Sequence, residues 1–172
     1  ALALSKRMTD PWNINMFPTN TSGRVDLEAA EKLLQRDKPA LVSVMLVNNE
    51  TGVIQDVSSI ADMARAQGAM MHTDAVQGFG KIPVDFSVLK VHAMTLSAHK
   101  IYGPKGAAAL IVDKRLMLRP LIYGGGHENG LRSGTENVAA IVGLGAACEL
   151  AQSRLDETTK HTLPLQEHLE KG

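Results

Sequence analysis

The chain has 172 residues, of which 44% are hydrophobic, 21% charged and only 3% aromatic. This length and composition predict a globular domain with a buried core and exclude a disordered chain. Eighteen basic residues balance eighteen acidic ones, so the charge indicates neither a nucleic-acid partner nor a membrane surface. The single cysteine, Cys148, excludes an internal disulfide and favours a reducing compartment such as the cytoplasm.

Neither a membrane anchor nor a targeting signal is expected from the sequence. No uninterrupted apolar run approaches the length needed to cross a bilayer. Residues 1–7 lack an initiator methionine and an apolar signal core followed by a cleavage site. We therefore expect the chain to be an excerpt of a longer protein.

Apolar runs alternate with helical patterns along most of the chain. Residues 8–23 contain two prolines and are predicted to be irregular, and a helix is predicted to begin near Asp26, a suitable N-cap. The other predicted elements are, in order, a strand at 40–47, a helix at 57–67 ended by Gly68, a strand at 69–73, a short helix at 85–91, strands at 93–97 and 107–112, a helix at 137–152, and an amphipathic segment at 153–171 interrupted by Pro164.

This order predicts an α/β fold with a three-layer, doubly wound and mostly parallel sheet. The nearly continuous apolar run at 40–47 is typical of a strand that is buried on both faces, as in parallel sheets. The strand at 107–112 is expected to be antiparallel, because the connection at 103–106 is too short for a helical crossover.

Polar side chains follow three successive apolar runs. Asn49 follows the first run, Asp74 the second and Lys100 the third, at intervals of about one strand–helix unit. In open α/β sheets, ligands bind outside the carboxyl ends of the strands. An amide, a carboxylate and a primary amine are therefore expected to lie at one edge of the sheet.

These residue types leave several interpretations open. An acid facing an amine can be a plain ion pair, which stabilises an exposed site by only about 0–1 kcal/mol. Pyridoxal phosphate (PLP) uses both groups, because it joins to a lysine and needs an acid beside its pyridine nitrogen. A metal site could also be drawn from His72, Asp74 and His99, but no further ligand spacing supports it.

Four segments in sequence order resemble cysteine desulfurases, which belong to the class V aminotransferase group of fold-type I PLP enzymes. They are 47–52 (VNNETG), 72–77 (HTDAVQ), 97–106 (SAHKIYGPKG) and 124–137 (GGGHENGLRSGTEN). The last, glycine-rich segment favours the housekeeping subgroup that supplies sulfur for iron–sulfur clusters. The resemblance implies that the chain holds only part of the PLP-binding large domain.

The resemblance also implies roles around the PLP ring. Lys100 would form a Schiff base with the cofactor and later move protons. Asp74 would pair with the pyridinium nitrogen, and Gln77 would hydrogen-bond the phenolic oxygen of the ring. Asn49 would lie beside the ring, near that oxygen and the bound amino acid.

Three further residues would hold the cofactor phosphate. Ser97 and His99 would do so within one subunit, whereas Thr135 would reach into the site of the neighbouring subunit. The resemblance therefore implies a homodimer with shared active sites.

The implied reaction converts L-cysteine to L-alanine and leaves sulfur as a persulfide on an enzyme cysteine, for transfer to an acceptor or scaffold protein. Residues 1–152 would be the central part of the large domain, and 153–172 a helical segment leading toward a small domain. Several family parts are not found: the upstream Gly-Thr-Glu phosphate loop, the ring-stacking histidine, the substrate-carboxylate arginine and the mobile cysteine loop. We therefore expect this chain alone not to desulfurate cysteine.

Other assignments remain open beside this one. A selenocysteine lyase, another class V PLP transferase or a non-catalytic structural fragment would share much of the pattern. Lys105 is a second candidate for the cofactor lysine, although its place in a Gly-Pro-Lys-Gly turn favours an exposed charge. Cys148 lies in an apolar helical pattern and is expected to be a small buried hydrophobe, not the nucleophile.

Overall fold

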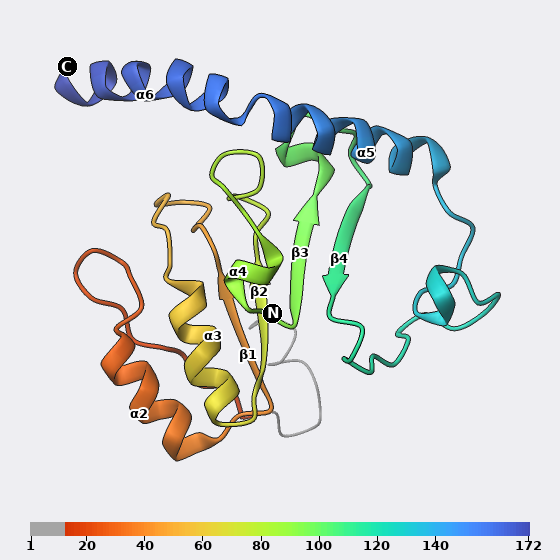
Figure 1. Ribbon diagram of the computed structural model, residues 1–172, viewed down its shortest axis with the longest axis horizontal. Helices are drawn as coiled ribbons and strands as arrows, with labels where there is room; N and C mark the ends of the chain where they lie inside the picture. Colours follow the sequence, from red (N-terminus) through yellow and green to blue (C-terminus); the bar gives the residue numbers. More distant parts are fainter. Residues whose placement is uncertain (1–12) are drawn as a thin grey trace.

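The computed structural model describes residues 13–172 and shows a four-stranded sheet with helices beside it and along one edge (Figure 1). The predictions for residues 1–12 lie outside this range. The elements are, in chain order, α2 (Leu27–Asp37), β1 (Leu41–Met45), α3 (Val57–Ala66), β2 (Met70–Asp74), α4 (Phe86–Leu89), β3 (Ala93–Ser97), the 3-10 turn η1 (Ala98–Lys100), β4 (Ala108–Val112), the 3-10 turn η2 (Glu128–Gly130), α5 (Val138–Ser153) and α6 (Leu155–Lys171).

The strand order β1-β2-β3-β4 follows the chain. The first three strands are parallel, and β4 is antiparallel to β3, with Ser97 opposite Ala108. The predicted α/β class and mostly parallel sheet are therefore confirmed, as is the antiparallel direction of the fourth strand. The carboxyl ends of β1, β2 and β3 consequently lie at the same edge.

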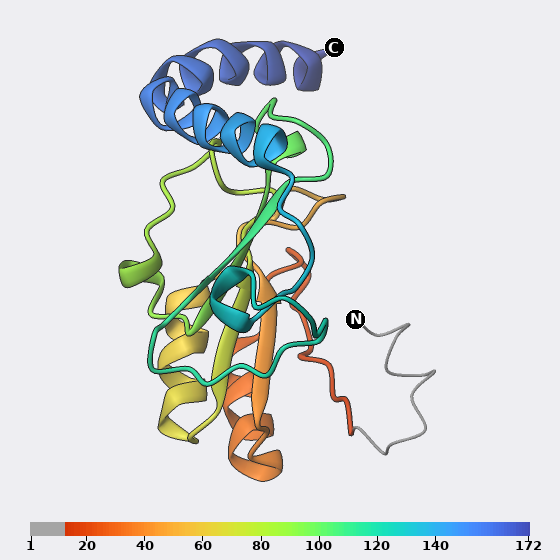
Figure 2. The ribbon, with the colours of Figure 1, turned by 90° about the vertical axis from the view of Figure 1, so that its right-hand side faces the viewer.

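One face of the sheet packs against helices. Alternate strand residues such as Val42, Met71 and Leu96 are buried there, in the same core cluster as residues of α2 and α3. Figure 2 shows α3 and α4 on this side of the sheet. On the opposite face, Leu41 and Leu110 remain 56% and 51% exposed. In residues 13–172, helices therefore pack against the face of the sheet that carries Val42, Met71 and Leu96.

Local capping explains where the helices begin and end. The side chain of Asp26 accepts a hydrogen bond of 3.0 Å from the amide of Ala29, which confirms the predicted start of α2. Asp56 caps α3 in the same way, through the amide of Ser59 at 3.1 Å. Beyond α3, Gly68 has φ +74°, a left-handed conformation that costs glycine little.

The expectation that Pro164 interrupts the last segment is wrong. Helix α6 runs through Pro164 without a break, and the chain bends instead by 68° between α5 and α6, at Arg154. Proline removes one backbone donor from a helix, and the carbonyl thereby freed can be hydrated, because α6 has no buried residue. In residues 13–172, no single helix is long and apolar enough to cross a membrane; α5 and α6 meet that length and composition only as a bent pair.

Candidate active site

Asp74 and Ser97 lie on one face of the sheet at the ends of neighbouring strands. The register pairs Asp74 with Thr95 of β3, so the side chains of these two residues point to the same side. Ser97 follows Thr95 by two residues in the same strand and shares this side. The strand ends therefore bring the carboxylate of Asp74 and the hydroxyl of Ser97 to one edge of the sheet.

The carboxylate of Asp74 is oriented by the backbone that follows it. Its Oδ1 accepts a hydrogen bond of 3.0 Å from the amide of Val76. Within residues 13–172, Oδ2 accepts no hydrogen bond. One carboxylate oxygen is thus held in place, and the other can accept a hydrogen bond from a ligand.

His72 lies two residues before Asp74 on the same strand face. Ser43 Oγ of β1 lies 2.8 Å from His72 Nδ1. Burial lowers the pKa of His72 below its usual 6.5, and the charge of Asp74 partly offsets this effect. The sequence singled out His72 only as a possible metal ligand. Its contact with Ser43 joins β1 to β2, and this contact depends on the sheet register.

A second pair of polar groups follows β3. Ser97 Oγ lies 2.8 Å from His99 Nδ1, so the hydroxyl and the imidazole form one unit. The imidazole belongs to η1, which also carries Lys100, and both His99 and Lys100 are exposed. A hydroxyl, an imidazole and a primary amine are thus grouped within four consecutive residues.

Lys81 contacts the candidate lysine, and sequence reasoning missed it. Its Nζ donates a hydrogen bond of 3.2 Å to the backbone carbonyl of Lys100. Partial burial lowers the pKa of Lys81 below its usual 10.5, and the nearby charge of Lys100 lowers it further. Lys81 lies in the turn after β2, where no periodic pattern could have marked it.

The remaining predicted residues lie in loops. Gln77 is half-buried in the turn directly after β2, close along the chain to Asp74. Asn49 is exposed in the loop after β1, which is shaped by Asn48 Oδ1 accepting from the amides of Glu50 and Thr51 at 2.9 Å each. Both loops emerge at the carboxyl edge of the sheet.

Thr135 is not brought to the strand ends within one chain. It is exposed in the glycine-rich loop at 124–137, which lies beyond β4 and away from the carboxyl ends of the parallel strands (Figure 1). The structure therefore separates this residue from Asp74 and Lys100.

The alternative candidates receive less support. Among residues 13–172, no group of three histidine, cysteine, aspartate or glutamate side chains is arranged to hold a metal ion. Lys105 is exposed in the turn before β4. Cys148 is half-buried, not fully buried as expected, and this burial raises the pKa of its thiol above 9.0.

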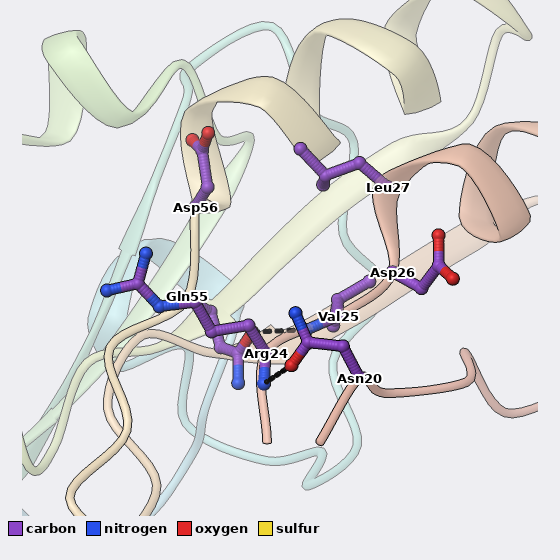
Figure 3. Close-up of a pocket in the computed structure, with 7 residues that line it drawn as sticks. All are labelled: Asn20, Arg24, Val25, Asp26, Leu27, Gln55 and Asp56. Carbon is purple, nitrogen blue, oxygen red and sulfur yellow. Dashed lines mark hydrogen bonds between the residues drawn. The ribbon is translucent and has the colours of Figure 1, made fainter. Parts of the chain in front are cut away.

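A cavity of about 430 Å³ lies elsewhere, at the N-terminal ends of α2 and α3 (Figure 3). The side chain of Gln55 accepts a hydrogen bond of 2.8 Å from the amide of Val25, and Asn20 Oδ1 accepts one of 3.1 Å from the amide of Arg24. These bonds join the loops that precede the two helices. Neither Asp74 nor Lys100 lines this cavity, so we interpret it as a gap between these loops.

Known proteins are similar to this chain in sequence and in fold. Residues 3–172 match the family model of class V aminotransferases. The chain is 47% identical over 150 residues to cysteine desulfurase IscS of Rickettsia rickettsii (strain Iowa), an alignment covering 86% of this chain and 36% of the relative. It is also 47% identical over 163 residues to the mitochondrial cysteine desulfurase of Arabidopsis thaliana, covering 94% and 36%.

A solved structure agrees with these relatives. The X-ray structure of a NifS-like protein from Rickettsia africae ESF-5 is 39% identical, with a TM-score of 0.89, and the match covers 100% of this chain and 49% of that one. The chain therefore belongs to the aminotransferase class V family. It spans about a third of the length of the curated relatives.

Proposed function

We propose that this chain is the cofactor-holding part of a PLP-dependent cysteine desulfurase. The enzyme would convert L-cysteine to L-alanine and pass the sulfur to an acceptor or scaffold protein for iron–sulfur cluster or thio-cofactor assembly. The supporting observation is the sheet register, which places Asp74 beside β3, the strand that leads directly into Lys100. The relatives named cysteine desulfurases support the choice of reaction.

The described side chains fit PLP, on which cysteine desulfurases of this family depend. The carboxylate of Asp74 keeps one oxygen for the protonated pyridine nitrogen. Ser97 and His99, 2.8 Å apart, offer donors for a phosphate. The chemistry that PLP supplies is an aldehyde that joins to primary amines and a ring that accepts electrons from the substrate carbon.

Each of the other proposed site residues would have a separate role. Lys100 would hold the cofactor through its Nζ and then take and return a proton at the substrate carbon. Gln77 would orient the ring through its phenolic oxygen, and Asn49 would contact the ring near the bound amino acid. The negative charge of Asp74 would keep the ring nitrogen protonated, because an adjacent carboxylate favours the charged form of a base.

Thr135 would serve the second subunit of a homodimer. Its loop lies away from the strand ends of its own chain, which supports a role in the partner's site, as in the shared sites proposed for the dimer. We assign residues 1–152 to the large domain and residues 153–172 to the approach to the small domain. We also propose a cytoplasmic location, although one of the relatives carries the name mitochondrial.

Sulfur removal also needs a nucleophilic thiolate, which we do not assign to Cys148. Burial raises the pKa of that thiol, so little thiolate forms near neutral pH. The attacking cysteine and the group that binds the substrate carboxylate would belong to other parts of the longer enzyme. This chain alone would therefore bind the cofactor without releasing alanine beyond one equivalent.

An absorbance titration with PLP tests the proposal. The chain is expected to develop a near-visible band that shifts when L-cysteine is added, and Asp74→Asn is expected to weaken cofactor binding by about tenfold or more, since it removes a charge-assisted hydrogen bond. Glu31→Gln, on the exposed surface of α2, is the matched control and should leave the band unchanged. A band that is equally strong in Asp74→Asn would contradict the assignment of Asp74.

A further inference from the structure

The imidazole of His127 contacts the residues on both sides of Thr135. The amide of Gly134 donates a hydrogen bond of 3.3 Å to His127 Nδ1. On the other side, Glu136 Oε2 lies 3.8 Å from His127 Nε2. Each ring nitrogen therefore faces one neighbour of Thr135.

These contacts indicate which ring nitrogen carries the proton. Because Nδ1 accepts a hydrogen bond from an amide, the proton of the neutral ring lies on Nε2, which faces the carboxylate of Glu136. A distance of 3.8 Å is too long for a hydrogen bond, so this second contact is electrostatic. The Gly134 bond is thus the directional one, and the Glu136 carboxylate lies beside the other ring nitrogen.

Further hydrogen bonds, made by Ser133, hold the same loop next to the His127 ring. Ser133, only 6% exposed, donates its amide to the carbonyl of Ile122 at 3.1 Å, and its Oγ accepts from the amide of Gly126 at 3.4 Å. A Cβ at Gly125 would lie 3.0 Å from the His127 ring, so a larger residue there would push the ring from this position. The two limbs of the loop, 124–127 and 133–136, are therefore held against each other.

We propose that His127 is a positioning residue that presents the hydroxyl of Thr135 to the cofactor phosphate. Thr135 itself is exposed, so the direction of its side chain depends on how the flanking peptides are held. Holding them before the phosphate arrives reduces the entropy lost on binding and so raises affinity. This inference rests on the proposed function, because the phosphate contact of Thr135 comes from it.

The test compares PLP with pyridoxal, which lacks the phosphate, on the full-length dimeric enzyme stripped of cofactor. His127→Leu keeps the bulk of the side chain but removes both ring contacts. It is expected to weaken PLP binding by about tenfold, a loss equal to the net contribution of about one hydrogen bond, because Thr135 is then less well positioned for the phosphate. Binding of pyridoxal should stay unchanged, because pyridoxal has no phosphate. His127→Asn places its Oδ1 close to the position of the ring Nδ1, so it can still accept from the Gly134 amide and should restore PLP affinity to within about threefold.

Thr135→Ala distinguishes the phosphate contact of Thr135 from the positioning role of His127. If it weakens PLP binding while His127→Leu does not, the inference is overturned and the role of Thr135 stands. If Thr135→Ala leaves PLP affinity unchanged, the phosphate contact of Thr135 and the positioning role of His127 are both wrong. Equal weakening of PLP and pyridoxal by His127→Leu would show general support of the fold and would also overturn the inference.

A variant that keeps more of the loop covers the case in which His127→Leu does not fold. His127→Gln can bring its side-chain amide toward Glu136 but has no acceptor where the ring Nδ1 meets the Gly134 amide. It is expected to weaken PLP binding by an intermediate factor, with pyridoxal binding unchanged. Wild-type affinity for PLP in both His127→Gln and Glu136→Gln, combined with an unfolded His127→Leu, would assign the ring to folding alone and overturn the proposal.

Discussion

The amine of Lys81 donates a hydrogen bond of 3.2 Å to the backbone carbonyl of Lys100. The first residue comes from the turn after β2 and the second from the turn after β3, so the bond joins two neighbouring strand ends. Gly80 allows the two segments to approach closely, because a Cβ there would lie 2.8 Å from the side chain of Ile101. The backbone that carries Lys100 is thus held by the segment that follows Asp74.

Removal of the Lys100 charge should raise the pKa of Lys81. Burial lowers this pKa most, and the charge of Lys100 adds to the effect. Lys100→Met leaves the burial and removes the charge, so the Lys81 amine should hold its proton to higher pH. An NMR titration of ¹³C-labelled lysine side chains measures the change, with Lys105→Met as the control. An unchanged or lower pKa of Lys81 would show that the two amines are not close.

Replacement of Asp74 should lower the pKa of His72 further. Burial holds this pKa below 6.5, and the Asp74 carboxylate acts in the opposite direction. In Asp74→Asn the opposing charge is lost, so the imidazole should titrate at lower pH in an NMR experiment. Since the unfolded chain binds the His72 proton more readily, this residue's contribution to stability should rise as pH increases from the lowered pKa to 6.5. A rise in the pKa of His72 on this substitution would contradict the shared strand face.

Asp56 should stabilise α3 at neutral pH and lose this effect in acid. The hydroxyl and the amide of Ser59 bond its carboxylate and lower its pKa below 3.8. Asp56→Ala should reduce the free energy of unfolding by about 1 kcal/mol at pH 7, a usual cost of losing an N-cap. The stabilising effect is complete above pH 3.8 and lost as pH falls through the lowered pKa.

Urea unfolding of the wild type, Asp56→Ala and Asp56→Asn measures this effect. Asparagine can still accept the Ser59 amide but does not titrate in this range, so that variant should show no such loss in acid. A difference between wild type and Asp56→Ala that stays constant from pH 7 to below the lowered pKa would contradict the capping role.

Cys148 should react slowly with alkylating agents near neutral pH. Burial raises the pKa of its thiol above 9.0, and the thiolate is the reactive form. The rate of modification by iodoacetamide should stay below that of a small free thiol at pH 7 and increase once pH exceeds 9. A rate at pH 7 equal to that of free cysteine would show that this residue could serve as the missing nucleophile.

Most of the fold could be predicted because local signals and tertiary packing agree. Apolar runs marked the strands, Asp26 marked the start of α2, and Gly68 marked the end of α3. Pro164 was misleading because an exposed helix can leave one carbonyl to water. The bend occurs instead at Arg154, where no glycine or proline marks it.

The candidate site was predictable only where its residues follow strands. Asp74 and Lys100 end or follow apolar runs, so their common edge could be read from sequence order. The contacts of Lys81 and His127 could not, because each joins segments whose approach depends on loop conformation. Sequence spacing likewise did not reveal that Cys148 is only half-buried, because its helix is apolar on most sides.

Reduction with borohydride in the presence of PLP, followed by peptide mapping, tests the central assignment most directly. Reduction fixes the cofactor to the amine that holds it, and mass spectrometry then identifies the modified residue. We expect stoichiometric modification of Lys100, with Lys81 and Lys105 unmodified, and no modification in Lys100→Ala. Cofactor found on Lys105 or Lys81 in the wild type, or the same extent of modification in Lys100→Ala, would contradict the proposed site.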